Sequence, residues 1–188
     1  MIEAFSNIAT AFGLSASAGL NAYLPLLIVA LVARYTDLIK LNEPWDVMTS
    51  WWVIAVLVVL LLIEMTVDKI PAVDTVNDAI QTLGRPAAGA ILFASSSGVV
   101  GDLHPVLAIT AGLLLAGGVH TAKTVARPMV TATTAGTGNW LVSLIEDILA
   151  LIGTILSILI PVLVMLTIIF LLLFIFWWRG RRVKASTA

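Results

Sequence analysis

Long apolar runs, with the few charges placed near their ends, constrain the fold of this 188-residue chain more than any other feature. Hydrophobic residues make up 60% of the sequence and charged residues only 11%. Residues 155–178 form a run of 24 without a charge, and a helix of that length exceeds the roughly 30 Å hydrocarbon core of a bilayer. A soluble single-core domain does not fit this composition, so the sequence predicts an all-α integral membrane protein.

About six segments are hydrophobic enough to be considered as spans. They cover residues 8–32, 51–67, 86–100, 106–119, 139–152 and 155–178. The third and fourth are short for a full crossing, and are expected to be either tilted spans joined by a tight turn or a re-entrant pair shielded by neighbouring helices. The chain is thus expected to form one transmembrane domain over residues 1–188, with a basic cytoplasmic tail at 179–188.

The distribution of Lys and Arg orients this six-segment arrangement, because cytoplasmic loops carry an excess of both. With the N-terminus inside, residues 68–85, residues 123–138 and the tail are cytoplasmic and hold eight of the ten basic residues. Only Arg34 and Lys40 then lie outside. The first cytoplasmic loop is expected to contain a short amphipathic helix, residues 72–83, that lies on the membrane surface. This topology places both termini in the cytoplasm.

Two stretches resemble each other at an offset of 99 residues. Gly13-Leu14 aligns with Gly112-Leu113, Ala18-Gly19 with Gly117-Gly118, and Asn21 with His120. Chance is one explanation, because Gly is frequent in membrane helices. The other is a duplication of residues 6–101 as 105–178, giving two inverted three-segment repeats as in many transporters. Gly19 and Asn21 would then be helix-packing or pore-lining residues, and the small-residue face around Gly19 would support a homo-oligomer.

Two pairs of acidic residues lie in or beside the apolar segments. Glu64 and Asp68 are four residues apart and share a helix face, and Glu146 and Asp147 are adjacent inside the fifth segment. Ionisable groups at membrane depth usually pair with one another or face a cavity, so these four carboxylates are candidates for a proton or cation site. The alternative is structural: Glu64 would pair with an arginine on a neighbouring helix, and one of the second pair with a cation of the preceding segment.

Basic and hydroxyl side chains gather around the end of the fourth segment. His120, Lys123 and Arg127 share a helix face, and a stretch rich in Thr and Gly then leads into the next helix. Helix N-termini and glycine-rich turns present N–H groups that suit anions. The candidate anion-binding or substrate-binding residues are therefore Arg85, His120, Lys123, Arg127, Thr134 and Asn139. The alternative is that Lys123 and Arg127 are the positively charged flank of the fourth segment and His120 only packs.

Several classes of function lack support in the sequence. No GxxxxGK[ST], GxSxG or HExxH motif occurs, and the two histidines are far from a metal-binding spacing. The net charge of −1 provides no electrostatic footprint for nucleic acid, and there are no cysteines. The expectation is a protein without enzymatic activity, metal or cofactor.

Five strings of polar and small residues together resemble a known family. They are Ala18-Gly19-Leu20-Asn21-Ala22-Tyr23, Asp68-Lys69-Ile70-Pro71 with Asp74, Arg85-Pro86-Ala87-Ala88-Gly89-Ala90, Thr133-Thr134-Ala135-Gly136 with Gly138-Asn139, and Ser143 before Glu146-Asp147. Over residues 6–150 this pattern is similar to a bacterial family of small multi-pass membrane proteins of unknown function (DUF4126-like). The resemblance implies a bacterial inner-membrane location and one recurrent architecture, and it brings no established activity.

The function expected from these residues is transport of a small solute or ion through the membrane, coupled to protons. The acidic residues would carry the proton or cation, and the basic residues would bind an anionic group of the solute. One alternative is a translocase of anionic lipid or lipid-carrier phosphate, whose ligand would be the lipid head group. Another is a non-transporting membrane scaffold or partner subunit. The lipid bilayer is a partner under all three hypotheses.

Overall fold

The computed structural model describes residues 2–41, 43–67, 71–96, 104–134 and 138–161, and also 163, 166, 167, 169–174 and 177. Side chains are described for these residues except 2–4 and 71–79. Within these ranges the chain is helical and contains no strand, which confirms the all-α fold. The helices are α1 (Ile2–Leu20), α2 (Tyr23–Tyr35), the 3-10 helix η1 (Trp45–Thr49), α3 (Trp51–Val67), α4 (Pro71–Ser95), α5 (Pro105–Thr134) and α6 (Asn139–Leu159).

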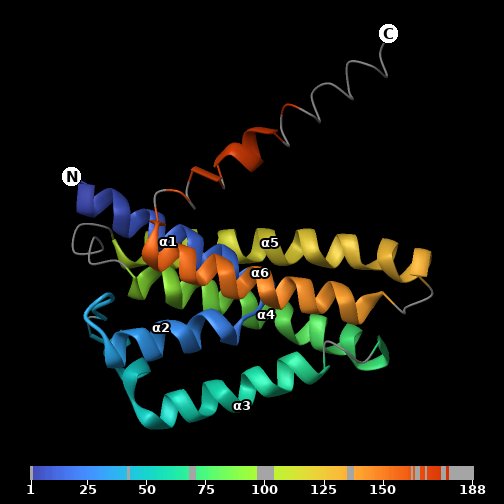
Figure 1. Cartoon of the computed structure of the whole chain (residues 1–188), viewed down its shortest axis with the longest axis horizontal. Helices are drawn as coiled ribbons and strands as arrows, with labels where there is room; N and C mark the ends of the chain where they lie inside the picture. Colours follow the sequence, from blue (N-terminus) through green and yellow to red (C-terminus); the bar gives the residue numbers. More distant parts are fainter. Residues whose placement is uncertain are drawn as a thin grey trace.

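The α-helices of the bundle lie roughly along one direction (Figure 1). α1 is packed against α4, α5 and α6, and α2 is packed against α3. α4 and α5 contact each other extensively. Consequently α1 occupies the centre of the bundle, with helices from both halves of the chain around it.

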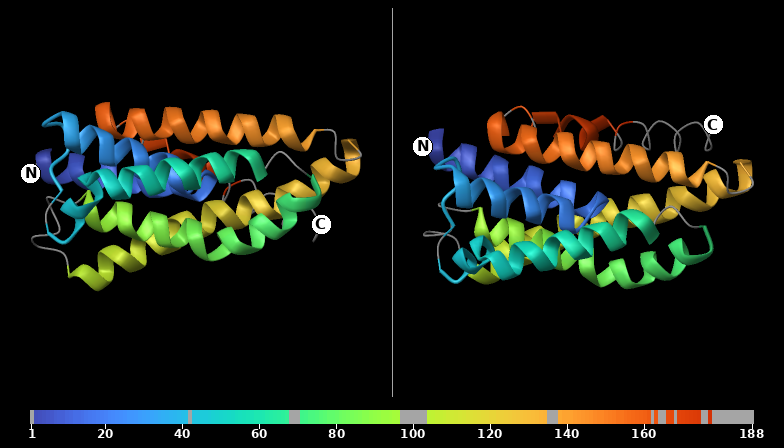
Figure 2. Two further views of the ribbon diagram at one scale, coloured as in Figure 1. Left: turned by 90° about the horizontal axis from the view of Figure 1, so that it is seen from below. Right: turned by 60° about the horizontal axis from the view of Figure 1, so that its bottom comes forward.

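The segment 8–32, predicted as one span, is two helices. α1 ends at Leu20, α2 begins at Tyr23, and the chain reverses between them partway along the bundle (Figure 1; Figure 2). Pro25 explains the break, because its ring would clash with the carbonyl of residue 21 in a continuous helix and it has no N–H to donate. Asn21 stabilises the new start, since its Oδ1 accepts a hydrogen bond from the Leu24 amide at 2.9 Å.

This reversal corrects the predicted topology. Ser6, near the start of α1, lines the same pocket as Lys40, which follows α2, so both lie at one end of the bundle. The prediction that the N-terminus and Lys40 lie on opposite sides is therefore wrong. In addition, Arg85, Lys123 and Arg127, counted as loop residues, are buried inside α4 and α5. The distribution of Lys and Arg therefore no longer supports the prediction that both termini are cytoplasmic.

The middle segments are longer helices than predicted. α4 contains residues 72–83 and most of 86–100 in one helix of 25 residues, and α5 has 30, which correspond to about 37 and 45 Å. Residues 72–83 are therefore helical, as predicted, but belong to α4 rather than to a separate helix, and the re-entrant alternative is not confirmed. α4 continues through Pro86, which packs toward Gly117 of α5: a Cβ built at Gly117 would be 3.6 Å from Pro86 Cγ.

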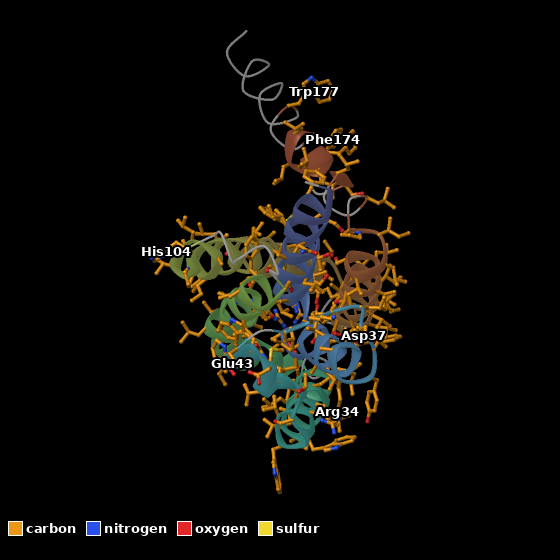
Figure 3. The ribbon with its side chains drawn as sticks, turned by 90° about the vertical axis from the view of Figure 1, so that its left-hand side faces the viewer. Arg34, Asp37, Glu43, His104, Phe174 and Trp177 are labelled. Carbon is orange, nitrogen blue, oxygen red and sulfur yellow. The ribbon has the colours of Figure 1, made fainter. Side chains whose placement is uncertain are left out.

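The boundary between the last two predicted segments also differs. α6 continues to Leu159 and takes the beginning of the predicted span 155–178. Pro161 lacks an amide hydrogen, which explains why the helix ends just before it. Phe174 and Trp177 belong to the described residues of the C-terminal segment and lie away from the bundle (Figure 3).

Polarity in this fold is arranged opposite to that of a soluble bundle. The outward positions of α3, α5 and α6 are large and apolar, for example Trp52 at 86% exposure and Leu114 at 66%. The buried positions of α6 are instead small or polar: Asn139, Ser143, Glu146, Asp147, Ala150, Thr154 and Ser157. Two helices, α5 and α6, are long and apolar enough to cross a membrane, and α2 and α3 are shorter apolar helices.

The predicted inverted repeats are not confirmed. In the described residues, 6–101 contain α1 to α4 whereas 105–178 contain α5 and α6 before the C-terminal segment. The aligned stretches themselves lie in α1, which ends at Leu20, and in α5, which continues past His120. The division into repeats and a basic tail stays a prediction.

Two helix contacts depend on glycine. A Cβ added to Gly19 of α1 would lie 2.5 Å from Val119 Cβ and 2.6 Å from Ala116 O of α5. Where α4 meets α5, a Cβ on Gly112 would be 2.3 Å from Gly89 O. Any larger residue at these positions would force the helices apart. The small-residue face of α1 therefore allows α1 to pack closely at the centre of the bundle.

We expect Gly19→Val to lower the free energy of unfolding by about 1–3 kcal/mol, because the added side chain overpacks the contact between α1 and α5. The measurement is equilibrium unfolding of the purified protein followed by circular dichroism. Gly118→Val is the matched control, since a Cβ at Gly118 meets nothing within 4 Å. Equal effects of the two substitutions would contradict the close contact at Gly19.

Candidate functional site

Seven ionisable side chains of the described residues are buried between the helices, each at most 9% exposed. Three are carboxylates, three are Lys or Arg side chains, and the seventh is a histidine. They come from α3 to α6: Glu64, Arg85, His120, Lys123, Arg127, Glu146 and Asp147. We call this set the charge network. The formal charges of its carboxylates and cations cancel when His120 is neutral.

Glu64 of α3 binds the beginning of α2. Its carboxylate accepts hydrogen bonds from the amide of Ala22, with both oxygens at 3.2 Å, and from the amide of Tyr23 at 3.4 Å. The first amides of a helix have no partner within the helix and carry its positive dipole end, so a carboxylate is a favourable partner there. Glu64 thereby fixes the point at which α2 begins.

Arg85 of α4 neutralises Glu64. Arg85 Nη2 is 3.2 Å from Glu64 Oε1, and both side chains are almost fully buried. Arg85 Nη1 is also 3.0 Å from His120 Nδ1, and His120 Nε2 is 3.3 Å from the hydroxyl of Thr82. The pair is therefore part of a chain of polar contacts that joins α3, α4 and α5.

One carboxylate of α6 binds two cations of α5. Glu146 Oε2 is 2.8 Å from Arg127 Nη2 and 3.0 Å from Lys123 Nζ. Lys123 and Arg127 are four residues apart and so share one face of α5. Lys123 Nζ also donates to the carbonyl of Leu20 at 3.4 Å, at the end of α1. Carbonyls at a helix C-terminus carry the negative dipole end, which favours a cation.

Asn21 and Asp147 complete the contacts around the break between α1 and α2. Asn21 Nδ2 donates to Asp147 Oδ1 at 2.9 Å, and both side chains are buried. The break is thus bound from three sides, by Glu64 of α3, Lys123 of α5 and Asp147 of α6. Each helix end faces the charge that its dipole favours: α1 ends at a cation and α2 begins at an anion.

The remaining predicted site residues lie elsewhere or outside the described residues. Thr134 is at the end of α5, where its hydroxyl donates to Val130 O at 2.7 Å and accepts from the Gly138 amide at 3.1 Å. Asn139 begins α6 and accepts from the hydroxyl of Thr131 at 3.1 Å. Residues 135–137 of the predicted glycine turn and Asp68, the predicted partner of Glu64, are not among the described residues.

The structure distinguishes between the alternatives left by the sequence. Lys123 and Arg127 are not an exposed positive flank, because each is only 6% exposed and both contact Glu146. Glu64 pairs with an arginine of a neighbouring helix, as the structural alternative supposed. The basic residues predicted to bind an anionic solute thus contact the protein's own carboxylates in this conformation.

Two buried polar residues close to the network were not among the predicted site residues, although one of them, Ser143, belongs to the strings that resemble a known family. Gln81 is one helical turn before Arg85, and Ser143 is one turn before Glu146; they are 2% and 0% exposed. Gln81 Oε1 and Ser143 Oγ have no hydrogen-bond partner among the described residues. A signal for Ser143 was present, because small and polar residues recur at helical spacing along the otherwise apolar α6.

The described part of the chain offers no group of three or more His, Cys, Asp or Glu side chains that could hold a metal ion. His104, the second histidine, is exposed at the start of α5 and points away from the bundle (Figure 3). The chemistry available in the network is therefore proton exchange, ion pairing and hydrogen bonding to a polar or charged solute.

The family model described as "Domain of unknown function (DUF4126)" matches residues 8–181, almost the whole chain. The chain therefore belongs to this family, which has no established activity, as the resemblance of its polar strings predicted. No curated protein and no solved structure matches it.

We expect Arg85→Met to destabilise the protein by about 3–5 kcal/mol, because it leaves the Glu64 carboxylate buried without its cation. The double variant Glu64→Gln/Arg85→Met should lose less than Arg85→Met alone, since no uncompensated charge remains. Arg34→Met is the control: Arg34 is exposed, and its removal should cost under about 1 kcal/mol. The free energies of unfolding of the wild type and the three variants are compared by equilibrium unfolding. Equal losses of stability in Arg85→Met and Arg34→Met would contradict the buried pair.

Proposed function

We propose that this member of the DUF4126 family is an integral membrane protein that transports a small solute or ion, and that the charge network is the site through which the solute passes. Location in a bacterial inner membrane and assembly as a homo-oligomer stay predictions. The proposal assigns no enzymatic step to the protein.

The inverted polarity of the bundle supports the membrane location. Large apolar side chains such as Trp52 and Leu114 cover the outside, whereas charged groups lie between the helices. In water this arrangement would expose far more apolar surface than soluble proteins tolerate. In a bilayer it places the apolar side chains against lipid and lets the charged groups pair with one another.

The break between α1 and α2 is the observation that carries the transport proposal. A helix that ends inside a bundle leaves backbone amides and carbonyls without partners, and hydrocarbon offers none. Here Glu64 of α3 and Lys123 of α5 supply partners for those backbone groups, and Asp147 of α6 binds the side chain of Asn21 at the break. Transporters use such discontinuous helices to form solute and ion sites near the middle of the membrane.

A purely structural role explains these features less well. Buried ion pairs seldom stabilise a protein more than apolar residues of similar volume would. A scaffold could be built from continuous apolar helices with small-residue contacts, such as those at Gly19. Seven buried ionisable groups and an interrupted helix are understandable if the protein must bind and release a polar solute.

The charge balance of the network favours coupling to protons. Three carboxylates face three cations, so a charged solute that enters adds a net charge in a medium of low dielectric constant, which is costly. A proton that binds when an anionic solute enters, or leaves when a cationic solute enters, restores the charge balance. We assign the proton to Asp147, beside the break, and the binding of an anionic solute group to Lys123 and Arg127, with Glu146 as the group that the solute displaces.

Glu64 and Arg85 have a different role in this proposal. Glu64 contacts two backbone amides and Arg85, which makes it the anchor of α2 rather than the first candidate for proton exchange. Glu64 was one of the four carboxylates that the sequence offered as a proton or cation site.

The expected result for Asp147→Asn in proteoliposomes is that solute-dependent proton flux falls to background, because the amide cannot take and release a proton. The flux is measured with a trapped pH dye under an imposed pH gradient, with a panel of small anionic, cationic and zwitterionic solutes. Asp46→Asn is the matched control and should retain wild-type flux, since Asp46 is exposed on η1.

Wild-type flux from Asp147→Asn would remove the role given to Asp147. If the wild-type protein carries no proton or solute at all, transport is excluded and two other assays follow. Flip of labelled anionic lipid in the same vesicles tests the lipid translocase, and capture of a stable complex tests the scaffold.

A further inference from the structure

A pocket lies at the end of the bundle where α1 begins. Its volume is about 210 Å³. Its polar lining comes from α1, from the residues after α2 and from the end of α4: Ser6, Asn7, Thr10, Lys40 and Ser96. Ile158, near the end of α6, also lines it. The pocket is therefore located where the beginning of α1 and the end of α6 meet, well away from the charge network.

The buried face of α6 carries two hydroxyl groups between the pocket and the network, with Ala150 as its one larger apolar interruption among the described residues. Ser157 and Thr154 are fully buried and lie about three and about two helical turns from Asp147, between it and the pocket. Their hydroxyls donate to carbonyls of their own helix, Ser157 to Gly153 O and Thr154 to Ala150 O. The hydroxyl oxygens can still accept hydrogen bonds, because each has two lone pairs.

α1 provides the opposite wall. A Cβ added to Gly153 would be 2.7 Å from Ser17 Oγ, so α1 and α6 touch at these residues. One turn further along α1, Asn21 contacts Asp147. Thr10 and Ser17 of α1, and Asn21 just after it, thus follow the same line as Ser157, Thr154 and Asp147 of α6. We call this line the α1–α6 seam.

A separate observation indicates that this face of α6 binds polar groups. Ser143 lies on it just beyond the network and is 0% exposed, yet its hydroxyl has no hydrogen-bond partner among the described residues. Buried hydroxyls almost always have a partner, so one without it marks a place for water or a solute. Helix packing alone would be served equally well by alanine, as at Ala150 of the same face.

We propose that the pocket is the entrance for a small hydrophilic solute with its water, and that the α1–α6 seam is the route from the pocket to Asp147. This inference rests on the proposed transport function and adds its entrance and route. The seam is closed at Ser17 and Gly153 in this conformation, so passage requires α1 to separate from α6 there. Oxygen lone pairs along the seam favour a solute that carries hydrogen-bond donors, such as hydroxyl groups, besides the anionic group that Lys123 and Arg127 would bind.

The chain contains no cysteine, which permits a direct test of this route. Ser157→Cys and Thr154→Cys each introduce a single thiol in the seam. Ile155→Cys is the matched control on the outward face of the same helix, where Ile155 is 41% exposed. Thr10→Cys marks the face of the membrane on which the pocket opens.

Each variant, as full-length protein in lipid vesicles, is treated with a charged membrane-impermeant methanethiosulfonate from one face and then the other, without solute. These reagents attack thiolates, which form only where water reaches the thiol. We therefore expect Ser157→Cys and Thr154→Cys to react at least about tenfold faster than Ile155→Cys, and only from the face that labels Thr10→Cys.

Rates for both seam variants equal to that of Ile155→Cys would overturn the route, because the seam would then be a dry helix contact. Reaction from the opposite face only would also overturn it. Labelling is measured without solute, so a failure here is distinguishable from a failure of transport in the flux assay. If Thr154→Cys does not fold, Ser157→Cys alone decides the question, since it replaces one oxygen by sulfur.

Discussion

The rest of this structure depends on the hydrogen bonds that the backbone amides and carbonyls make where α1 ends and α2 begins. Within a bundle that excludes water, free amides and carbonyls need partners, and each one left without a partner costs several kcal/mol in hydrocarbon. Glu64 supplies the amides of α2 with a carboxylate, and Lys123 supplies a carbonyl of α1 with an ammonium group. Both side chains are long and come from other helices, so the break also determines where α3 and α5 must lie.

Each of these charges requires a counter-charge, and the remainder of the network follows from that need. Arg85 lies against Glu64, and Glu146 lies against Lys123 and Arg127. Removal of one partner would leave a buried charge uncompensated, which is far more destabilising than the absence of the pair. The network is therefore a single electrostatic unit, in which a change of charge at one site must be balanced at another. That property would link the movement of a solute to the movement of a proton.

Close helix packing makes this unit possible. Glycines at 19, 89 and 112 allow α1, α4 and α5 to approach until their backbones touch, which excludes water and keeps the ion pairs short. The contact of α1 with α6 is different. It is close at Ser17 and Gly153 but has a pocket at its end and hydroxyl groups along it. Motion of α1 would be expected at this contact.

The sequence by itself determined the all-helical class and the identity of all seven ionisable residues in the network, because these depend on composition and on local helical spacing. It also contained the signal for the break, in Asn21 and Pro25, although the apolar run from 8 to 32 concealed it. Only the tertiary structure decided which charges meet. Asn21 and Asp147 are 126 residues apart, and Lys123 and Leu20 are 103 apart. Helical periodicity shows which face a side chain occupies within its own helix, but the partner on that face is set by how the helices pack together.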